Sequence, residues 1–169
     1  MMDVVLVDEK DKEIGLEEKL EAHKNGQLHR AFSVFVFNSK KELLMQKRAS
    51  KKYHSSGLWT NTCCSHPRKG EDVKKEAEKR LKEEMGFSCN LEKKFGFIYR
   101  AVLENNLIEH EYDYVFFGKY DKNPNPNKSE VDDWRWVSLK ELKREIKKNP
   151  KKYSPWLRII IDDIVSLIT

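Results

Sequence analysis

The sequence contains no apolar run near the roughly 20 residues that a membrane-spanning helix needs, and its N-terminus lacks a signal-peptide pattern. Internal repeats and low-complexity segments are missing as well. We therefore expect a globular chain without membrane insertion and with a cytoplasmic location. At 169 residues, with 38% hydrophobic and 36% charged residues, the chain is expected to form a single domain over residues 1–169.

Cysteine is scarce, and its three copies make a poor disulfide framework. The count is odd, and a bridge between the neighbours Cys63 and Cys64 would strain the chain. We expect all three thiols to be reduced.

Positive charge is in excess, but the net charge is only +5. Lysines are interleaved with glutamates across residues 72–84 and 140–152, which is typical of solvated helix faces rather than of a nucleic-acid surface. We therefore expect a small-molecule partner and no nucleic acid. The oligomeric state stays open between a monomer and a weak dimer.

Aromatic and β-branched residues occupy both faces of residues 30–38, which is typical of a buried central strand. Residues 43–47 follow as its expected hairpin partner. Further strands are expected at residues 4–7, 94–102, 107–120 and 131–137.

Residues 72–85 carry apolar side chains at four-residue steps and precede a glycine, which predicts an amphipathic helix with a glycine stop. Ser138 and Glu141 form a capping box for a second helix, and Pro155 suits the first turn of a last one. The apolar residues available for packing in the last helix are Ile159, Ile160, Ile164 and Leu167. Together these elements predict an α+β fold, with a mixed β-sheet core and flanking helices.

The densest chemistry lies in residues 59–67, where two thiols, an imidazole and an amide fall within six residues. Asn61, Cys63, Cys64 and His66 supply these groups. We interpret this stretch as an active-site loop.

Glu109 and Glu111 alternate along an expected strand and so project from one face, where carboxylates repel unless a cation or a proton lies between them. Three histidines in other parts of the chain can complete a metal site. The candidate ligands are His23, His29, His66, Glu109 and Glu111, and they suit a five- or six-coordinate ion such as Zn²⁺, Mn²⁺ or Mg²⁺.

Glu84 suggests a second site, for a hard cation, and Arg80 lies one helical turn before it. An ordinary surface ion pair between these two residues is the simpler alternative. Four basic residues could hold a diphosphate jointly with a magnesium ion: Lys19, Arg48, Lys52 and Arg80.

These residues resemble the type 1 isopentenyl-diphosphate delta-isomerases, which belong to the Nudix superfamily. The resemblance covers nearly the whole chain. It is carried by His23 with residues 28–33, and by residues 60–67, 99–101, 109–111 and 154–156.

The resemblance implies an α/β Nudix sandwich and the interconversion of isopentenyl diphosphate and dimethylallyl diphosphate in isoprenoid biosynthesis. It implies Cys64 and Glu111 as the acid/base pair and Tyr99 as a further catalytic residue, which would flank the hydrocarbon tail together with Trp156. Glu84 and the main-chain carbonyl of Cys64 would hold Mg²⁺ through the substrate phosphates. The five histidine and glutamate ligands would hold a second divalent ion, Mn²⁺, Zn²⁺ or Mg²⁺, and the four basic residues would bind the diphosphate.

Two departures from the family patterns are visible. Nudix hydrolases place an Arg-Glu dipeptide where this chain has Lys79 and Arg80, so a hydrolase would lose a metal ligand there. This departure favours the isomerase over a Nudix pyrophosphohydrolase, which is the enzymatic alternative. Residues 55–57, Ser-Ser-Gly, stand where an aromatic-proline-glycine turn is expected, and they leave the shape of the pocket rim open.

A zinc-stabilised binding module is the non-enzymatic alternative. Its tetrahedral ligands would be His23, His29, Cys64 and His66. This alternative leaves Glu109 and Glu111 unexplained.

Overall fold

The computed structural model describes residues 2–52 and 54–168. In this part the chain forms a nine-stranded mixed sheet, four α-helices and two short 3-10 helices. In chain order the elements are β1 Asp3–Val7, β2 Glu13–Glu18, α1 Lys19–Asn25, β3 His29–Phe37, β4 Glu42–Arg48, β5 Trp59–Thr60, β6 Cys63–Ser65, α2 Val73–Met85, β7 Glu92–Val102, η1 Glu104–Asn106, β8 Ile108–Lys119, β9 Val131–Ser138, α3 Leu139–Lys148, η2 Pro150–Lys152 and α4 Pro155–Ile168.

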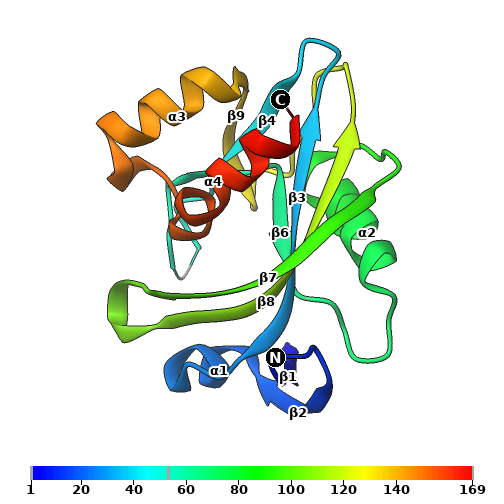
Figure 1. Ribbon diagram of the computed structural model, residues 1–169, viewed down its shortest axis with the longest axis vertical. Helices are drawn as coiled ribbons and strands as arrows, with labels where there is room; N and C mark the ends of the chain where they lie inside the picture. The colour runs from blue at the N-terminus through cyan, green and yellow to red at the C-terminus, as the bar shows by residue number, and fades with distance from the viewer. Residues whose placement is uncertain (1, 53, 169) are drawn as a thin grey trace.

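Strand β3 runs through the centre of the sheet (Figure 1). It pairs in parallel with β8, from His29 opposite Glu111 to Phe37 opposite Lys119, and antiparallel with β6. β8 also forms a long antiparallel hairpin with β7. Segments that are far apart in the sequence therefore lie side by side at β3.

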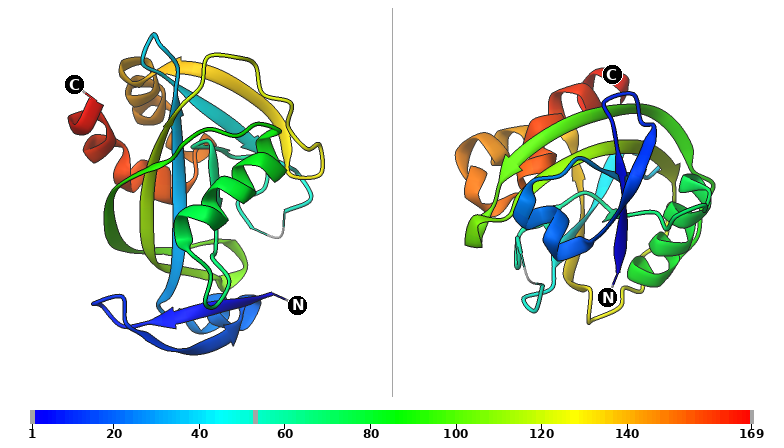
Figure 2. Two further views of the ribbon diagram at one scale, coloured as in Figure 1. Left: turned by 90° about the vertical axis from the view of Figure 1, so that its right-hand side faces the viewer. Right: turned by 90° about the horizontal axis from the view of Figure 1, so that it is seen from below.

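Side chains alternate along β3 and divide the apolar core into two layers. Phe35 and Phe37 pack in the cluster that contains α3 and α4, whereas Val34 and Val36 pack in the cluster that contains α2. The helices accordingly cover opposite faces of the sheet, as Figures 1 and 2 show. This sandwich confirms the predicted fold class and the predicted burial of the central strand.

Helix α2 lies where the sequence predicts it. Asp72 caps the N-terminus by accepting a hydrogen bond from the main-chain N–H of Lys75. Gly86 ends the helix with a φ of 75°, and a Cβ atom there would lie 2.0 Å from the main-chain oxygen of Asn125. The C-terminal glycine is therefore required by its backbone conformation and by its close contact with the loop before β9.

Helices α3 and α4 also begin as predicted, at the Ser138 cap and at Pro155. The expected packing of α4 is only partly right. Ile160 and Ile164 are buried, but Ile159 is 48% exposed and Leu167 53% exposed. Ile159 lies off the core-facing stripe of the helix, and Leu167 lies in its last turn.

The predicted hairpin of β3 and β4 is wrong beyond its turn. The two strands are in register only at Phe37 and Leu43, and β4 pairs instead with β9 along its whole length. The sequence analysis also predicts neither β2 nor α1. Helix α1 has seven residues, too few for a helical period to be recognised.

No helix in the described part of the chain is both long and apolar enough to cross a membrane. All three cysteines are free thiols, as predicted.

Candidate functional site

The pairing of β3, β8 and β7 brings three expected site residues into one row. His29 of β3 lies opposite Glu111 of β8, and Glu111 lies opposite Tyr99 of β7. Glu109 is two residues before Glu111, and both carboxylates are buried on the same face. The predicted pairing of the two glutamates is thus present in the structure.

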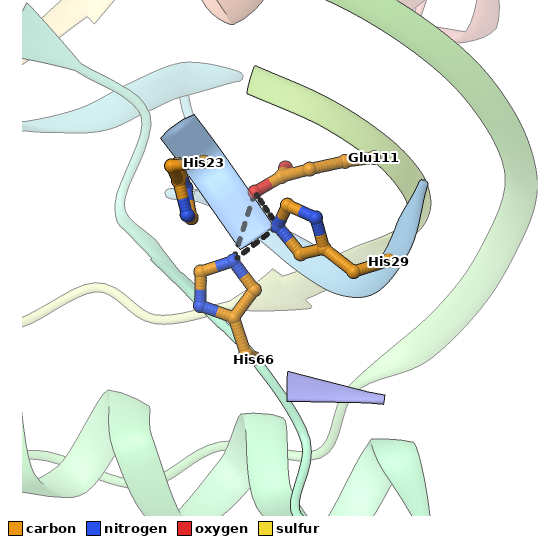
Figure 3. Close-up of side chains that lie close together, drawn as sticks. All are labelled: His23, His29, His66 and Glu111. Carbon is orange, nitrogen blue, oxygen red and sulfur yellow. Dashed lines mark hydrogen bonds and ion pairs between the residues drawn. The ribbon is translucent and has the colours of Figure 1, made fainter. Parts of the chain in front are cut away.

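Three histidines converge on Glu111 (Figure 3). Glu111 Oε1 lies 2.9 Å from His66 Nε2 and 3.6 Å from His29 Nε2, and these two nitrogens are 3.2 Å apart. The ring of His23, on α1, lies 4.8 Å from the ring of His29, centroid to centroid. All four side chains are buried.

Main-chain carbonyls orient two of these imidazoles. His23 Nδ1–H donates to the carbonyl of Lys19 at 2.6 Å, and His29 Nδ1–H donates to the carbonyl of Gln27 at 2.8 Å. These bonds require a proton on Nδ1, and the Nε2 atoms face the cluster. Metal-binding histidines are commonly held in this way.

Tyr99 arranges the two carboxylates. Its hydroxyl lies 3.1 Å from Glu109 Oε2 and 2.7 Å from Glu111 Oε2, so it donates to either oxygen. Burial, together with the charges of both glutamates, raises the pKa of Tyr99 well above its usual value, which keeps this donor protonated. The Oε1 atoms are left to face the imidazoles.

Burial and neighbouring groups shift the pKa values of three residues of this set. Burial holds the pKa of His66 well below its usual value, so this imidazole is neutral. Burial also opposes ionisation of Glu111, but hydrogen bonds, first among them that of His29, bring its pKa down to about 2. Burial lowers the pKa of His23 as well, yet the hydrogen bond and charge of Glu109 produce a net rise, so a bound metal would displace a proton there. Imidazole nitrogens and carboxylate oxygens are donors that such an ion uses, so the residue types fit it.

His54 is a residue of this cluster that the sequence reading misses. Its Nε2 lies 3.5 Å from Glu109 Oε1, and His23 Nε2 lies 3.7 Å from the same oxygen. Among the described residues, two groups of potential ligands therefore share His23. The only signal in the sequence is an imidazole shortly before the active-site loop.

The two adjacent thiols point to opposite sides of β6, as expected for an extended chain. Cys63 packs in the core beside α2, whereas Cys64 lines a cavity. Cys64 Sγ lies 3.1 Å from Asn61 Nδ2 and 3.6 Å from Ser33 Oγ. Burial raises the pKa of the Cys64 thiol well above its usual value, so the thiol carries its proton at neutral pH.

Asn61 is a second residue whose importance the sequence reading underestimates. Its fully buried amide donates to the carbonyls of Val34 and Cys63 and accepts from Trp156 Nε1–H at 3.2 Å. It therefore ties β3, the thiol loop and α4 together at the cavity.

The cavity has a volume of about 270 Å³. Its lining includes all four predicted basic residues, Lys19, Arg48, Lys52 and Arg80. It also includes most of the remaining predicted residues, namely Cys64, His66, Glu84, Tyr99, Glu109, Glu111 and Trp156. His23 and His29 are fully buried and do not contribute to its lining.

Acidic partners hold two of the basic residues. Arg80 lies 2.6 Å from Glu84 Oε1, so the helical ion pair expected as the simpler alternative is present, but within the cavity wall. Lys52 pairs with Glu130. A larger hollow of about 780 Å³ lies near the C-terminal end of α4, and no predicted site residue lines it. The smaller cavity is therefore the candidate site, because the predicted residues line it and do not line the larger hollow.

Residues 27–157 match the model of the NUDIX domain. Isopentenyl-diphosphate Delta-isomerase 1 of Aromatoleum aromaticum is 55% identical over 96% of this chain and 92% of its own length. Isopentenyl-diphosphate Delta-isomerase 2 of Photorhabdus laumondii is 53% identical over 95% and 91%. The chain belongs to the isopentenyl-diphosphate Delta-isomerase family. A crystal structure of a Deinococcus radiodurans protein shares the fold, with a TM-score of 0.80 at 15% identity over 96% of this chain and 98% of that chain.

In this isomerase-family chain, residues 55–57, whose shape the sequence leaves open, follow His54, which lines the cavity. Arg48 donates to the carbonyls of His54 and Ser55, at 3.2 and 3.1 Å. Ser55 and Gly57 both have positive φ, 49° and 69°. The loop folds inward, and His54 and Ser55 are buried at 5% and 2% exposure.

Proposed function

We propose that this chain interconverts isopentenyl diphosphate and dimethylallyl diphosphate in isoprenoid biosynthesis. The names and near-complete coverage of its relatives agree with the function predicted from the sequence. The observation that carries the proposal is a single cavity that combines a protonated thiol, an ionised carboxylate and four basic side chains.

Moving a double bond by one carbon requires one proton to be added and another to be removed, through a carbocation-like state. Cys64, which holds its proton, and Glu111, which does not, can perform these two transfers. Tyr99 would act with Glu111, because its hydroxyl donates to that carboxylate at 2.7 Å. After one turnover the pair would have exchanged protonation states, which suits a reversible isomerisation.

The rest of the cavity would bind the two ends of the substrate. Lys19, Arg48, Lys52 and Arg80 would take the diphosphate charge. The indole of Trp156, which is 4% exposed, would stabilise positive charge on the hydrocarbon by roughly 0.5–2 kcal/mol. Its burial also limits the access of water to the carbocation.

Two divalent ions complete the proposal. Glu84 and the main-chain carbonyl of Cys64 would hold Mg²⁺ with the diphosphate, and the predicted histidine and glutamate set would hold Mn²⁺, Zn²⁺ or Mg²⁺. When bound, these ions would offset phosphate charge and keep Glu111 ionised. Glu84 is 4% exposed, and Gln46 Nε2 donates to its other oxygen at 3.2 Å.

An isomerisation assay with isopentenyl diphosphate and magnesium tests the reaction. We expect an acid-labile allylic product and no released phosphate. Release of inorganic phosphate or of a monophosphate, without allylic product, would instead identify a Nudix pyrophosphohydrolase.

We also propose that residues 1–169 form one domain acting in the cytoplasm, as a monomer or weak dimer. Sedimentation at several concentrations measures the association, and a stable higher oligomer would contradict it.

A further inference from the structure

Four of the five histidines of this chain lie in two groups of potential ligands that share His23, although the expected metal site uses only three. The fourth is His54, which stacks on His23 with ring centroids 5.7 Å apart. His110 lies on the other face of β8, where its Nδ1–H donates to the carbonyl of Gly26. His110 therefore lies outside the groups of potential metal ligands, whereas His54 lies within one of them.

The donor atoms of the expected site leave one position for another ligand. Tyr99 engages the Oε2 atoms of Glu109 and Glu111, so each carboxylate offers Oε1. Three imidazole nitrogens and these two oxygens make five donors. Mn²⁺ and Mg²⁺ prefer six donors in an octahedron, so such an ion would have one position left.

His54 Nε2 lies beside two of these five donors. It is 3.5 Å from Glu109 Oε1, the same oxygen that His23 Nε2 approaches to 3.7 Å. The carbonyl of His54 accepts from Arg48, its Nδ1 lies 3.3 Å from Ser55 Oγ, and its ring meets Trp156 edge-on. These contacts hold the ring with Nε2 directed at the carboxylate.

We propose that His54 is a sixth protein ligand of the metal ion in the histidine and glutamate site, bound through Nε2 next to His23 and Glu109. This inference rests on the proposed metal site. Six protein donors leave no position for water on the ion.

The test compares the wild-type chain with His54→Phe and His110→Phe, each loaded with Mn²⁺ in the absence of substrate. Phenylalanine keeps the ring volume and the contact with Trp156 but removes both nitrogens. The manganese dissociation constant and the relaxation of water protons by the bound ion are measured. The second quantity reports water bound directly to Mn²⁺.

We expect low water relaxation in the wild type and in His110→Phe. His54→Phe should bind Mn²⁺ about ten-fold or more weakly and show a clear rise in relaxation, as water takes the vacant position. Weaker binding without that rise would mean that His54 only orients Glu109, and water on the wild-type ion would also overturn the proposal. His54→Ala repeats the measurement if the phenylalanine variant folds poorly.

Neither readout depends on turnover. If the chain isomerises normally but fails this test, only the proposal that His54 is a metal ligand is contradicted. A chain that passes it without isomerising contradicts the proposed function instead, and a wild type that binds no Mn²⁺ removes the metal site itself.

Discussion

Cys63 and Cys64 are chemically identical neighbours in very different surroundings. Cys63 is fully buried against α2 in the apolar core, and Cys64 lines the cavity near Asn61 and Ser33. The difference arises because successive residues of an extended strand face opposite sides. Of these two thiols, only that of Cys64 faces the cavity in which we propose that the substrate binds.

Cys64→Ala should abolish isomerisation and leave metal content and folding nearly unchanged, because it removes a proton-transfer group but no ligand side chain. Turnover, metal analysis and thermal unfolding measure these three properties. Cys64→Ser is a sharper probe, since a hydroxyl is a far weaker acid than a thiol of pKa about 8.5.

Cys63→Ala is the matched control. It should keep most activity and cost about 1 kcal/mol of unfolding free energy, the usual cost of a small change in packing. An inactive Cys63 variant beside an active Cys64 variant would reverse the assignment.

At the scale of elements, helix α2 presents basic residues to two environments. Arg80 faces the cavity and contacts Glu84, whereas Lys79 is exposed beside Glu83 at 4.0 Å. Nudix hydrolases carry an Arg-Glu dipeptide at these two positions. Substitutions at these two positions of α2 therefore test whether the chain acts as an isomerase or as a hydrolase.

Arg80→Glu, which restores the hydrolase-like residue, should weaken diphosphate binding without creating an efficient pyrophosphohydrolase. The change removes a phosphate partner and adds repulsion near Glu84. We expect KM to rise by about ten-fold or more, which corresponds to a loss of about 1.4 kcal/mol or more of binding free energy. Lys79→Glu makes the mirror change on the exposed side and should alter KM little. Fast diphosphate hydrolysis by Arg80→Glu would show that the chain is a hydrolase with an altered motif.

Strand β9 and helix α3 are joined by a polar cluster away from the active site. Arg135 of β9 pairs with Glu145 of α3, and the hydroxyl of Tyr153 donates to the same carboxylate. The hydrogen bonds of Arg135, against the opposing effect of burial, lower the pKa of Glu145 below 4.5. The folded state thus binds fewer protons here than the unfolded state.

Glu145→Gln should therefore lower the unfolding free energy at pH 7 and have little effect at pH 3. An acidic side chain whose pKa is lower in the folded state than in the unfolded state stabilises the folded state at pH values above its unfolded-state pKa. This stabilisation is lost as the pH falls through its folded-state pKa. The side chains are about a third exposed, so we expect a loss of about 0.5–1 kcal/mol.

Urea unfolding at several pH values measures the effect, and Glu9→Gln, the same change at an exposed turn, is the control. A difference for Glu145→Gln that persists at pH 3 would assign the loss to packing instead of charge.

At the scale of the whole molecule, the apolar core extends well beyond the metal site. Two clusters of buried apolar residues cover the faces of the sheet, and one of them reaches the cavity through Phe32. The free energy of folding should therefore come mainly from apolar burial and not from metal binding.

Removing metal with a chelator should abolish isomerisation and leave circular dichroism nearly unchanged. The unfolding temperature should fall only modestly, by the binding free energy that the ion contributes. Unfolding on chelation would favour the zinc-stabilised module. Within the described residues, however, the ligand group that contains His23, His29 and His66 includes Glu111 and not Cys64.

The sequence by itself determined the features that depend on local geometry. The four-residue period and the glycine stop located α2, and two-residue alternation put Glu109 and Glu111 on one face. These predictions succeed because the direction of a side chain follows from the backbone of its own element.

Only the tertiary structure decided which elements meet. The parallel register of β3 and β8, which sets His29 opposite Glu111, joins residues 82 positions apart, and no local pattern encodes it. The pairing of β4 with β9 and the inward fold of His54 depend likewise on distant partners. Such contacts follow from the packing of the whole sheet and its helices, because register is set by burial on both faces at once.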